Sequence, residues 1–223
     1  MSLILNIDTA LDTASVCLSE KGNVLQLSSS ENQKDHASWL HIAIAELLQK
    51  SGYMIKDLQG LSVSIGPGSY TGLRVGLAAA KGFCYALKIP LITVSILKIL
   101  AFAVKEEAID IICPLIDARR MEVFTAAYDK ELREKISPHA LVVDEKSFAS
   151  FLSAGKVLFC GNGVKKLQPL ISNSNALFSN TMADASHLAR LSFNCYKNKE
   201  FADLAYAEPL YIKEFYSASR KNS

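Results

Sequence analysis

The chain has 223 residues, 50% of them hydrophobic, so it can bury a sizeable core as one larger domain or as two small lobes. Its 24 basic and 22 acidic residues give a formal charge of +2, which excludes a global field that would draw it onto nucleic acid or an anionic membrane. Five widely spaced cysteines without a Cys-x-x-Cys pair argue against a zinc ribbon and against a disulfide framework. There is no basic targeting region and no apolar run of the roughly 18 residues that span a membrane. We therefore expect a cytoplasmic protein that makes no membrane contact.

The first half of the chain predicts a strand meander followed by alternating helices and strands. Apolar runs at 3–7, 14–18 and 24–27 are separated by turn residues and indicate three short strands. A helix is expected from Asp35, as its N-cap, to Ser51, and a second helix over 71–87. Strands at 61–65 and 91–94 and a third helix over 95–107 complete an α/β lobe.

The second half predicts another α/β lobe with the same opening. Strands are expected at 109–116, 122–128, 140–143 and 157–160, and helices at 145–153 and 184–196. We place the domain boundary between a first lobe, 1–107, and a reduced second lobe, 108–223, whose C-terminal tail can return to the first. The first strand of each lobe ends in an aspartate, Asp8 or Asp117, which indicates an internal duplication.

A glycine-rich segment at 66–76 joins a strand to a helix, as phosphate-binding loops do. It lacks the Lys-Ser/Thr of a P-loop, and Thr71 stands where a dinucleotide fingerprint needs glycine. Gly72, Gly76 and Ala80 recur every fourth residue, so one helix face is nearly bare and lets a neighbour approach closely. That face could pack in the core or form a subunit interface, and we favour the interface.

The histidines do not indicate a metal centre. His36 and His41 are five residues apart, so on a helix they point about 140° away from each other. A zinc-binding pair needs a spacing of four, and no third ligand stands near them at metal-binding spacing. We expect no metal site.

Five residues occupy the places where a two-lobed ATPase holds magnesium, phosphate and adenosine. They are Asp8, Thr9, Asp117, Gly161 and Gly163. Ordinary turn and cap roles explain them equally well. We treat them as a vestigial nucleotide site.

The turn after Asp117 carries charge instead of glycine. Ala118, Arg119 and Arg120 stand where a phosphate-binding turn would need glycines to bring its N–H groups against the ligand. The second phosphate loop is therefore expected to be lost. The two guanidinium groups can pair with acids, bind a phosphate or stay solvated.

Several segments together resemble one family over nearly the whole chain. They are 4–10, 66–76, 117–124, 183–185 and 208–211. In this order they resemble the TsaB family, formerly YeaZ. That family usually has phenylalanine and isoleucine where Tyr70 and Val75 stand, and arginine where Lys213 stands, and residues 138–182 match it only loosely.

The resemblance implies a two-lobed α/β fold like that of actin, Hsp70 and the sugar kinases, with a reduced second lobe and an incomplete active site. It implies a non-catalytic scaffold and activator subunit. Its larger paralogue, TsaD, carries a metal and transfers a threonylcarbamoyl group to the adenosine beside the anticodon of tRNA, and TsaE supplies an ATPase.

The resemblance also places the pairing surface on the helices of the first lobe. Together with the bare helix face, it predicts a partner interface at Trp39, Ala43, Gly72, Gly76 and Ala80. A homodimer through the same surface, a nucleotide at the subunit interface and direct contact of Arg119 or Arg120 with tRNA stay open. No cofactor is expected in the isolated chain.

Two enzymatic alternatives remain. A small-molecule kinase of this fold would need both phosphate hairpins and an adenosine pocket. A peptidase, as an older label of the superfamily suggests, would need a metal site or a nucleophile beside a base.

Overall fold

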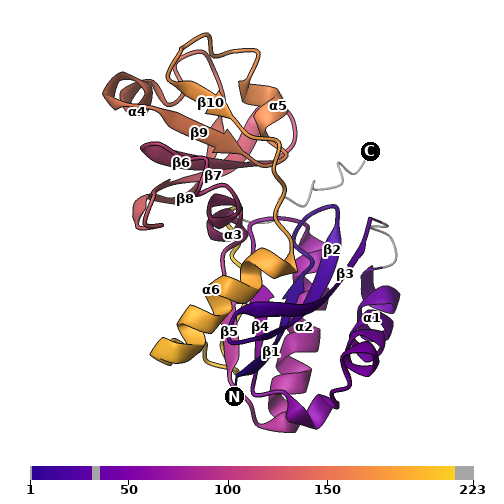
Figure 1. Cartoon of the computed structure of the whole chain (residues 1–223). Helices are drawn as coiled ribbons and strands as arrows, with labels where there is room; N and C mark the ends of the chain where they lie inside the picture. The colour runs from indigo at the N-terminus through magenta and orange to yellow at the C-terminus, as the bar shows by residue number, and fades with distance from the viewer. Residues whose placement is uncertain (1, 32–35, 214–223) are drawn as a thin grey trace, which may run out of the picture.

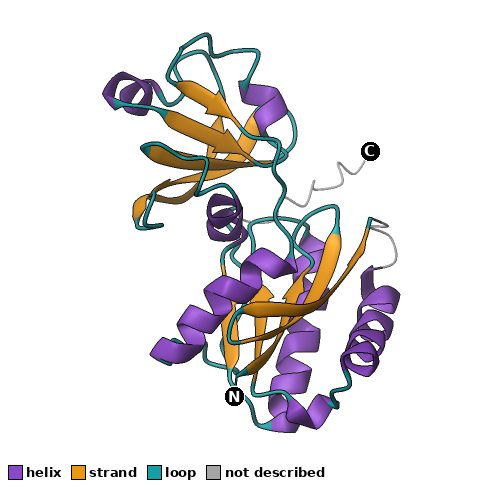
Figure 2. Cartoon of the chain, in the orientation of Figure 1, coloured by secondary structure: helices purple, strands orange, loops and turns teal. Residues whose placement is uncertain are grey.

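The computed structural model describes residues 2–31 and 36–213, which form two α/β lobes (Figures 1 and 2). The strand orders are β3-β2-β1-β4-β5 in the first sheet and β10-β9-β6-β7-β8 in the second. In each lobe the first strand pairs antiparallel with the second and parallel with the fourth. The predicted internal duplication and the actin-like fold class are confirmed.

The first sheet contains β1 (Leu3–Asp8), β2 (Ala14–Glu20), β3 (Asn23–Ser30), β4 (Gly60–Ser64) and β5 (Leu91–Val94). Its lobe also contains α1 (His36–Ser51), the 3-10 turn η2 (Ile55–Asp57), α2 (Tyr70–Leu87) and α3 (Ile96–Ala103). The second sheet contains β6 (Ile111–Asp117), β7 (Glu122–Asp129), β8 (Glu134–Val142), β9 (Val157–Cys160) and β10 (Ala176–Phe178). The remaining helices are α4 (Ala149–Ala154), α5 (Val164–Leu167) and α6 (Ala185–Asn198).

Several predicted elements match the structure, whereas others differ in their bounds or were not predicted. The meander, α2, β5 and β9 are confirmed, and the Asp35 N-cap lies outside the described residues. Strand β8 begins at Glu134 instead of 140, because it is an exposed edge strand in which Pro138 and charged residues mask the apolar signal. Helices α3 and α4 are shorter than expected, and α5 and β10 were not predicted.

Helix α6 belongs to the first lobe, which corrects the predicted domain boundary. Although it lies within 108–223, it packs against the first sheet, on the face opposite α1 and α2 (Figure 1). The buried Asn6 Oδ1 accepts hydrogen bonds from Ser62 Oγ on β4 and Ser192 Oγ on α6, each at 2.6 Å. A buried amide must be hydrogen-bonded, so this network fixes α6 on the sheet. The second lobe therefore consists of about residues 109–180 alone.

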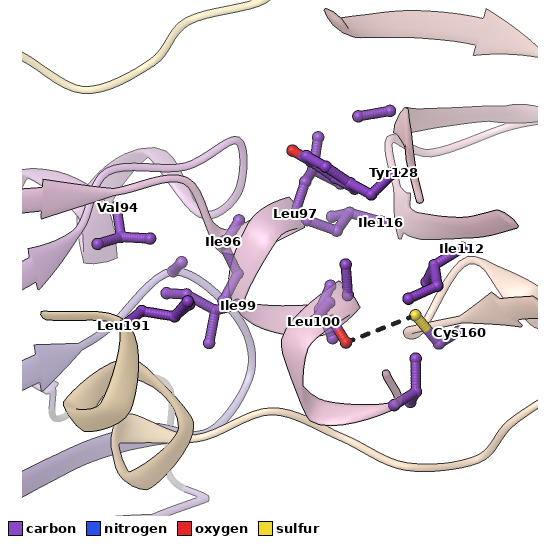
Figure 3. Close-up of a cluster of buried hydrophobic side chains, with 14 of the residues drawn as sticks. Val94, Ile96, Leu97, Ile99, Leu100, Ile112, Ile116, Tyr128, Cys160 and Leu191 are labelled. Carbon is purple, nitrogen blue, oxygen red and sulfur yellow. Dashed lines mark hydrogen bonds between the residues drawn. The ribbon is translucent and has the colours of Figure 1, made fainter. Parts of the chain in front are cut away.

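Helix α3 joins the lobes through one continuous hydrophobic cluster (Figure 3). It packs against α6 on one side and against β6 and β7 on the other. Leu100 is fully buried, and its carbonyl oxygen lies 3.8 Å from Cys160 Sγ of the second lobe. The two lobes therefore share a core.

All five cysteines are free thiols, and four of them are buried. Burial raises the pKa of Cys17 and Cys84 to about 12, so these thiols stay protonated and unreactive at neutral pH. In the described part of the chain, no helix is long and apolar enough to cross a membrane.

Replacing Leu100 with alanine is expected to lower the free energy of unfolding by about 2–5 kcal/mol, because it opens a cavity in the shared core. The matched control is Leu25→Ala, since Leu25 is 39% exposed on β3. Its cost should be below about 1 kcal/mol. Urea denaturation measures both, and equal losses would contradict a shared core.

Asp184 makes the N-terminal cap of α6 pH-dependent. Partial burial acts to raise its pKa, but hydrogen bonds from His187 and Ser186 lower the pKa of Asp184 to about 2. The cap therefore stabilises the fold fully above the ordinary pKa and loses this contribution as the pH falls towards 2. Asp184→Ala should cost about 1 kcal/mol at neutral pH. Thermal unfolding from pH 7 to pH 2 measures the difference in melting temperature between wild type and variant. This difference should narrow below pH 4, and a difference that stays constant would refute this role.

Candidate functional site: the interlobe cleft and the helix pair

The glycine segment packs against the turn between β1 and β2 in its own lobe. A Cβ atom on Gly72 would lie 2.1 Å from the carbonyl oxygen of Thr9, and one on Gly76 would lie 2.3 Å from Thr9 Oγ1. Thr9 Oγ1 donates a hydrogen bond to the carbonyl oxygen of Gly72 at 2.7 Å. Glycine is required because the helix backbone touches the β1 turn directly.

This packing corrects the predicted partner interface. Gly72, Gly76, Ala80 and Ala43 are buried within the first lobe, and Trp39 is only partly exposed. The bare stripe of α2 therefore faces the chain's own sheet, so the close approach that it permits is used inside the lobe. A partner contact on α1 and α2 would have to use their outer face.

The outer face of the helix pair is apolar and built of small residues. Ala78, Gly82 and Ala86 recur every fourth residue on the exposed side of α2, and a Cβ atom on Gly82 would meet nothing within 4 Å. Ile42 of α1 is 60% exposed and Tyr85 of α2 is 81% exposed. These five residues define what we call the outer face.

The end of β1 is closed to ligands. Asp8 is 2% exposed and Thr9 is fully buried. Asp8 Oδ1 accepts hydrogen bonds from Ser64 Oγ at 2.5 Å and from the Ala10 N–H at 3.1 Å. Burial raises the pKa of the Asp8 carboxyl, more than these hydrogen bonds lower it. Asp8 is thus part of the core of the lobe.

The end of β6 carries its own cation. Lys166 Nζ, on α5, lies 2.6 Å from Asp117 Oδ1 and donates to the carbonyl oxygen of Glu122 at 2.9 Å. Although desolvation acts to raise it, the hydrogen bond from Lys166 holds the pKa of Asp117 below its ordinary value. An ammonium group therefore already contacts one carboxylate oxygen of Asp117.

Of the five vestigial nucleotide residues, Asp117 alone lines a cavity between the lobes, and the set does not fit a magnesium nucleotide. Cβ atoms on Gly161 and Gly163 would lie 2.5 and 3.0 Å from the carbonyl oxygen of Leu115, so both glycines pack on β6. Asn162, between them, accepts from the Asp117 N–H at 2.9 Å. Among residues 2–31 and 36–213, no three His, Cys, Asp or Glu side chains come together as metal ligands. Since one carboxylate is buried and the other holds a lysine, neither is free for a metal.

The cleft itself consists of two adjoining cavities of about 340 and 650 Å³ between the lobes. They share the lining residues Gly68, Tyr70, Arg119 and Phe124. The rings of Tyr70 and Tyr211 lie 5.7 Å apart between centroids. The wall of the cleft is therefore aromatic, with one arginine at its centre.

The C-terminal segment forms this wall. It runs back along the first lobe, where the Leu210 N–H donates to the carbonyl oxygen of Ile65 at 2.7 Å and Lys81 Nζ donates to the carbonyl oxygen of Ala207 at 3.1 Å. Lys213 then forms an ion pair with Glu122 of the second lobe. The segment therefore clamps both lobes beside the cleft.

Sequence reasoning missed Lys166, Glu122 and Arg74 as site residues. Arg74 Nε donates to Tyr211 Oη at 3.0 Å across 137 positions of sequence. A spacing rule cannot detect a contact at that separation. The available signal was that both residues lie in segments shared with the family, 66–76 and 208–211.

Gly72→Ala is expected to lower the free energy of unfolding by about 3 kcal/mol, because its Cβ would collide with the Thr9 carbonyl. Gly82→Ala, in the same helix, should instead raise it by about 0.5–1 kcal/mol, since alanine favours the helix and meets open space. Urea denaturation of both variants provides the measurement. Similar effects of the two substitutions would contradict the described packing.

Comparisons with known proteins agree with this architecture. Residues 27–209 match the family described as "TsaD: tRNA N6-adenosine threonylcarbamoyltransferase". The tRNA threonylcarbamoyladenosine biosynthesis protein TsaB of Bacillus subtilis is 31% identical over 94% of this chain and 93% of its own length. YeaZ from Pseudomonas aeruginosa superposes with a TM-score of 0.83 at 27% identity, covering 95% of this chain and 100% of that one.

A more distant structure shares the fold alone. The activator of the 2-hydroxyisocaproyl-CoA dehydratase from Clostridium difficile, solved with bound ADPNP, superposes with a TM-score of 0.53 at 10% identity, covering 89% of this chain and 97% of that chain. The nucleotide belongs to that protein. On the full-length match to the Bacillus subtilis protein and the matching family model, this chain belongs to the TsaB (YeaZ) family and takes part in tRNA threonylcarbamoyladenosine biosynthesis.

Proposed function

We propose that this protein is a non-catalytic subunit that activates a TsaD-like catalytic paralogue by docking the outer face of α1 and α2 against it. The observation that supports this is a contrast between two surfaces of the first lobe. Its strand-end aspartate is buried against Ser64, whereas its helix pair exposes Ile42 and Tyr85 beside a stripe of small residues. Exposed apolar surface of this kind is typical of a protein interface.

The outer face favours a helical partner. Ala78, Gly82 and Ala86 carry little or no side chain, so the axis of a neighbouring helix can approach closely and make many backbone contacts. Ile42 of α1 and Tyr85 of α2 are exposed on the same helix pair and would be desolvated on docking. Docking activates the partner if it binds the active conformation more tightly than the inactive one.

Neither enzymatic alternative gains a supporting observation. A kinase needs its strand-end carboxylates for magnesium, and here Asp117 is held by Lys166. A cysteine peptidase needs an ionisable nucleophile, and burial raises the pKa of four of the cysteines well above neutrality. We therefore assign no catalytic residue to this chain.

The assay is threonylcarbamoyl transfer to tRNA by a reconstituted set of partner proteins, a TsaD-like paralogue and a TsaE-like ATPase, with and without this chain. Transfer that depends on this chain supports the activator role. Equal transfer in its absence, with each partner shown to be folded, would refute that role.

The docking surface is tested with Ile42→Glu and Ala78→Arg. Each places a charge on the outer face, so each is expected to weaken pairing by at least about tenfold and to reduce transfer in parallel, because an unpaired charge would be desolvated. Val142→Glu is the matched control, since Val142 is 65% exposed on β8 of the other lobe. Size-exclusion chromatography with the partner measures pairing. Unchanged pairing of both outer-face variants would contradict the proposed surface.

A further inference from the structure

The interlobe cleft contains an arginine whose side chain makes no hydrogen bond or ion pair in the described part of the chain. This residue, Arg119, lines both cavities, and its charge contributes to the lowered pKa of the neighbouring Asp117. The acids nearest in sequence are already paired, Asp117 with Lys166 and Glu122 with Lys213. Asp12, on the same wall, has an interaction of its own. Arg119 is therefore available to an anion from outside.

Planar aromatic groups stand beside this cation. Tyr70 and Tyr211 are 37% and 44% exposed, and both line the smaller cavity together with Arg119. The Arg74 guanidinium lies 3.9 Å from the centroid of the Tyr70 ring, and its Nε donates to Tyr211 Oη. Arg74 therefore holds the Tyr211 ring beside Tyr70, which has a further interaction of its own, and the exposed Tyr211 ring offers a stacking surface.

An arginine side chain without a hydrogen-bonding partner, beside an exposed tyrosine ring, fits one phosphate and one base. A nucleoside triphosphate is a poor match, because it would need a metal or several cations, and Asp117 is occupied by Lys166. A phosphodiester carries a single negative charge and matches Arg119 alone. Arg120, the next residue in the turn and also exposed, can contact a neighbouring phosphate.

We propose that the mouth of the interlobe cleft binds one nucleotide of a single-stranded RNA segment, with its phosphate on Arg119 and its base against Tyr211. This rests on the chain's part in tRNA threonylcarbamoyladenosine biosynthesis and extends the proposed function, because the subunit would then contact the substrate of the complex. The site lies in the cleft, whereas the docking surface lies on the outer face of α1 and α2.

The test measures fluorescence anisotropy of a labelled single-stranded RNA oligonucleotide with the full chain at several salt concentrations. Arg119→Ala is expected to weaken binding about tenfold and to reduce the slope of log K against log salt by about 0.7, the value for one phosphate contact to a single strand. Arg190→Ala removes the same charge from an exposed position on α6 and should change neither quantity.

The stacking contact is tested separately. Tyr211→Ala is expected to weaken binding about tenfold with the salt slope unchanged, because stacking releases no counterion. Tyr211→Phe keeps the ring but loses the hydrogen bond from Arg74 that positions it, so its affinity should lie between those of the wild type and Tyr211→Ala. Thermal unfolding verifies that each variant is folded.

Four outcomes would overturn the proposal. Absent binding by the wild type, or equal effects of Arg119→Ala and Arg190→Ala, removes the site. If AMP or ATP displaces the labelled RNA at concentrations similar to that of the RNA, the cleft is assigned to a free nucleotide instead. If blunt double-stranded RNA binds as tightly as single-stranded RNA, the base contact with the tyrosine ring is refuted. Ile42→Glu should bind RNA as wild type does, so failure of this site and failure of the docking surface are distinguishable.

Discussion

The hydrophobic contact of α3 with both sheets is the constraint on which the rest of the structure depends. Ile99 and Leu100 lie between Leu191 of the first lobe and Ile112 of the second, so this cluster joins the two lobes, each of which also has a core of its own (Figure 3). Proteins of this two-lobed class commonly close around a ligand by hinge motion, which requires separable cores. A shared core instead favours a fixed cleft, and the Lys213–Glu122 ion pair reinforces this by tying the C-terminal segment across it.

Within this fixed frame, groups that could serve nucleotide chemistry are engaged in packing. The glycine helix lies directly against Thr9, where a loop with free N–H groups would otherwise cradle a phosphate. Asp8 is buried against Ser64, and Lys166 provides the positive charge beside Asp117. The polar groups keep hydrogen-bonding partners, so they do not carry the penalty of an unsatisfied buried group.

The two faces of α2 divide structural and functional roles. The inner face, with Gly72 and Gly76, fits the turn after β1, and the outer face, with Ala78 and Gly82, is exposed among the residues that the structure describes. Both faces carry small residues every fourth position, because the same helical period generates both. The sequence alone therefore signals close approach by a backbone, but not which backbone approaches.

The sequence by itself determined the elements that depend on local periodicity and the family that depends on local motifs. The meander, α2 and β9 follow from runs of apolar residues, and the repeated strand-aspartate opening indicated the duplicated topology that both sheets show. Only the tertiary structure decided that α6 returns to the first lobe, that the glycine stripe faces inward and that Lys166 meets Asp117. These outcomes depend on contacts between residues far apart in sequence, such as Asn6 and Ser192. The energies of such contacts arise from burial and hydrogen bonding, and they leave no periodic pattern in either segment.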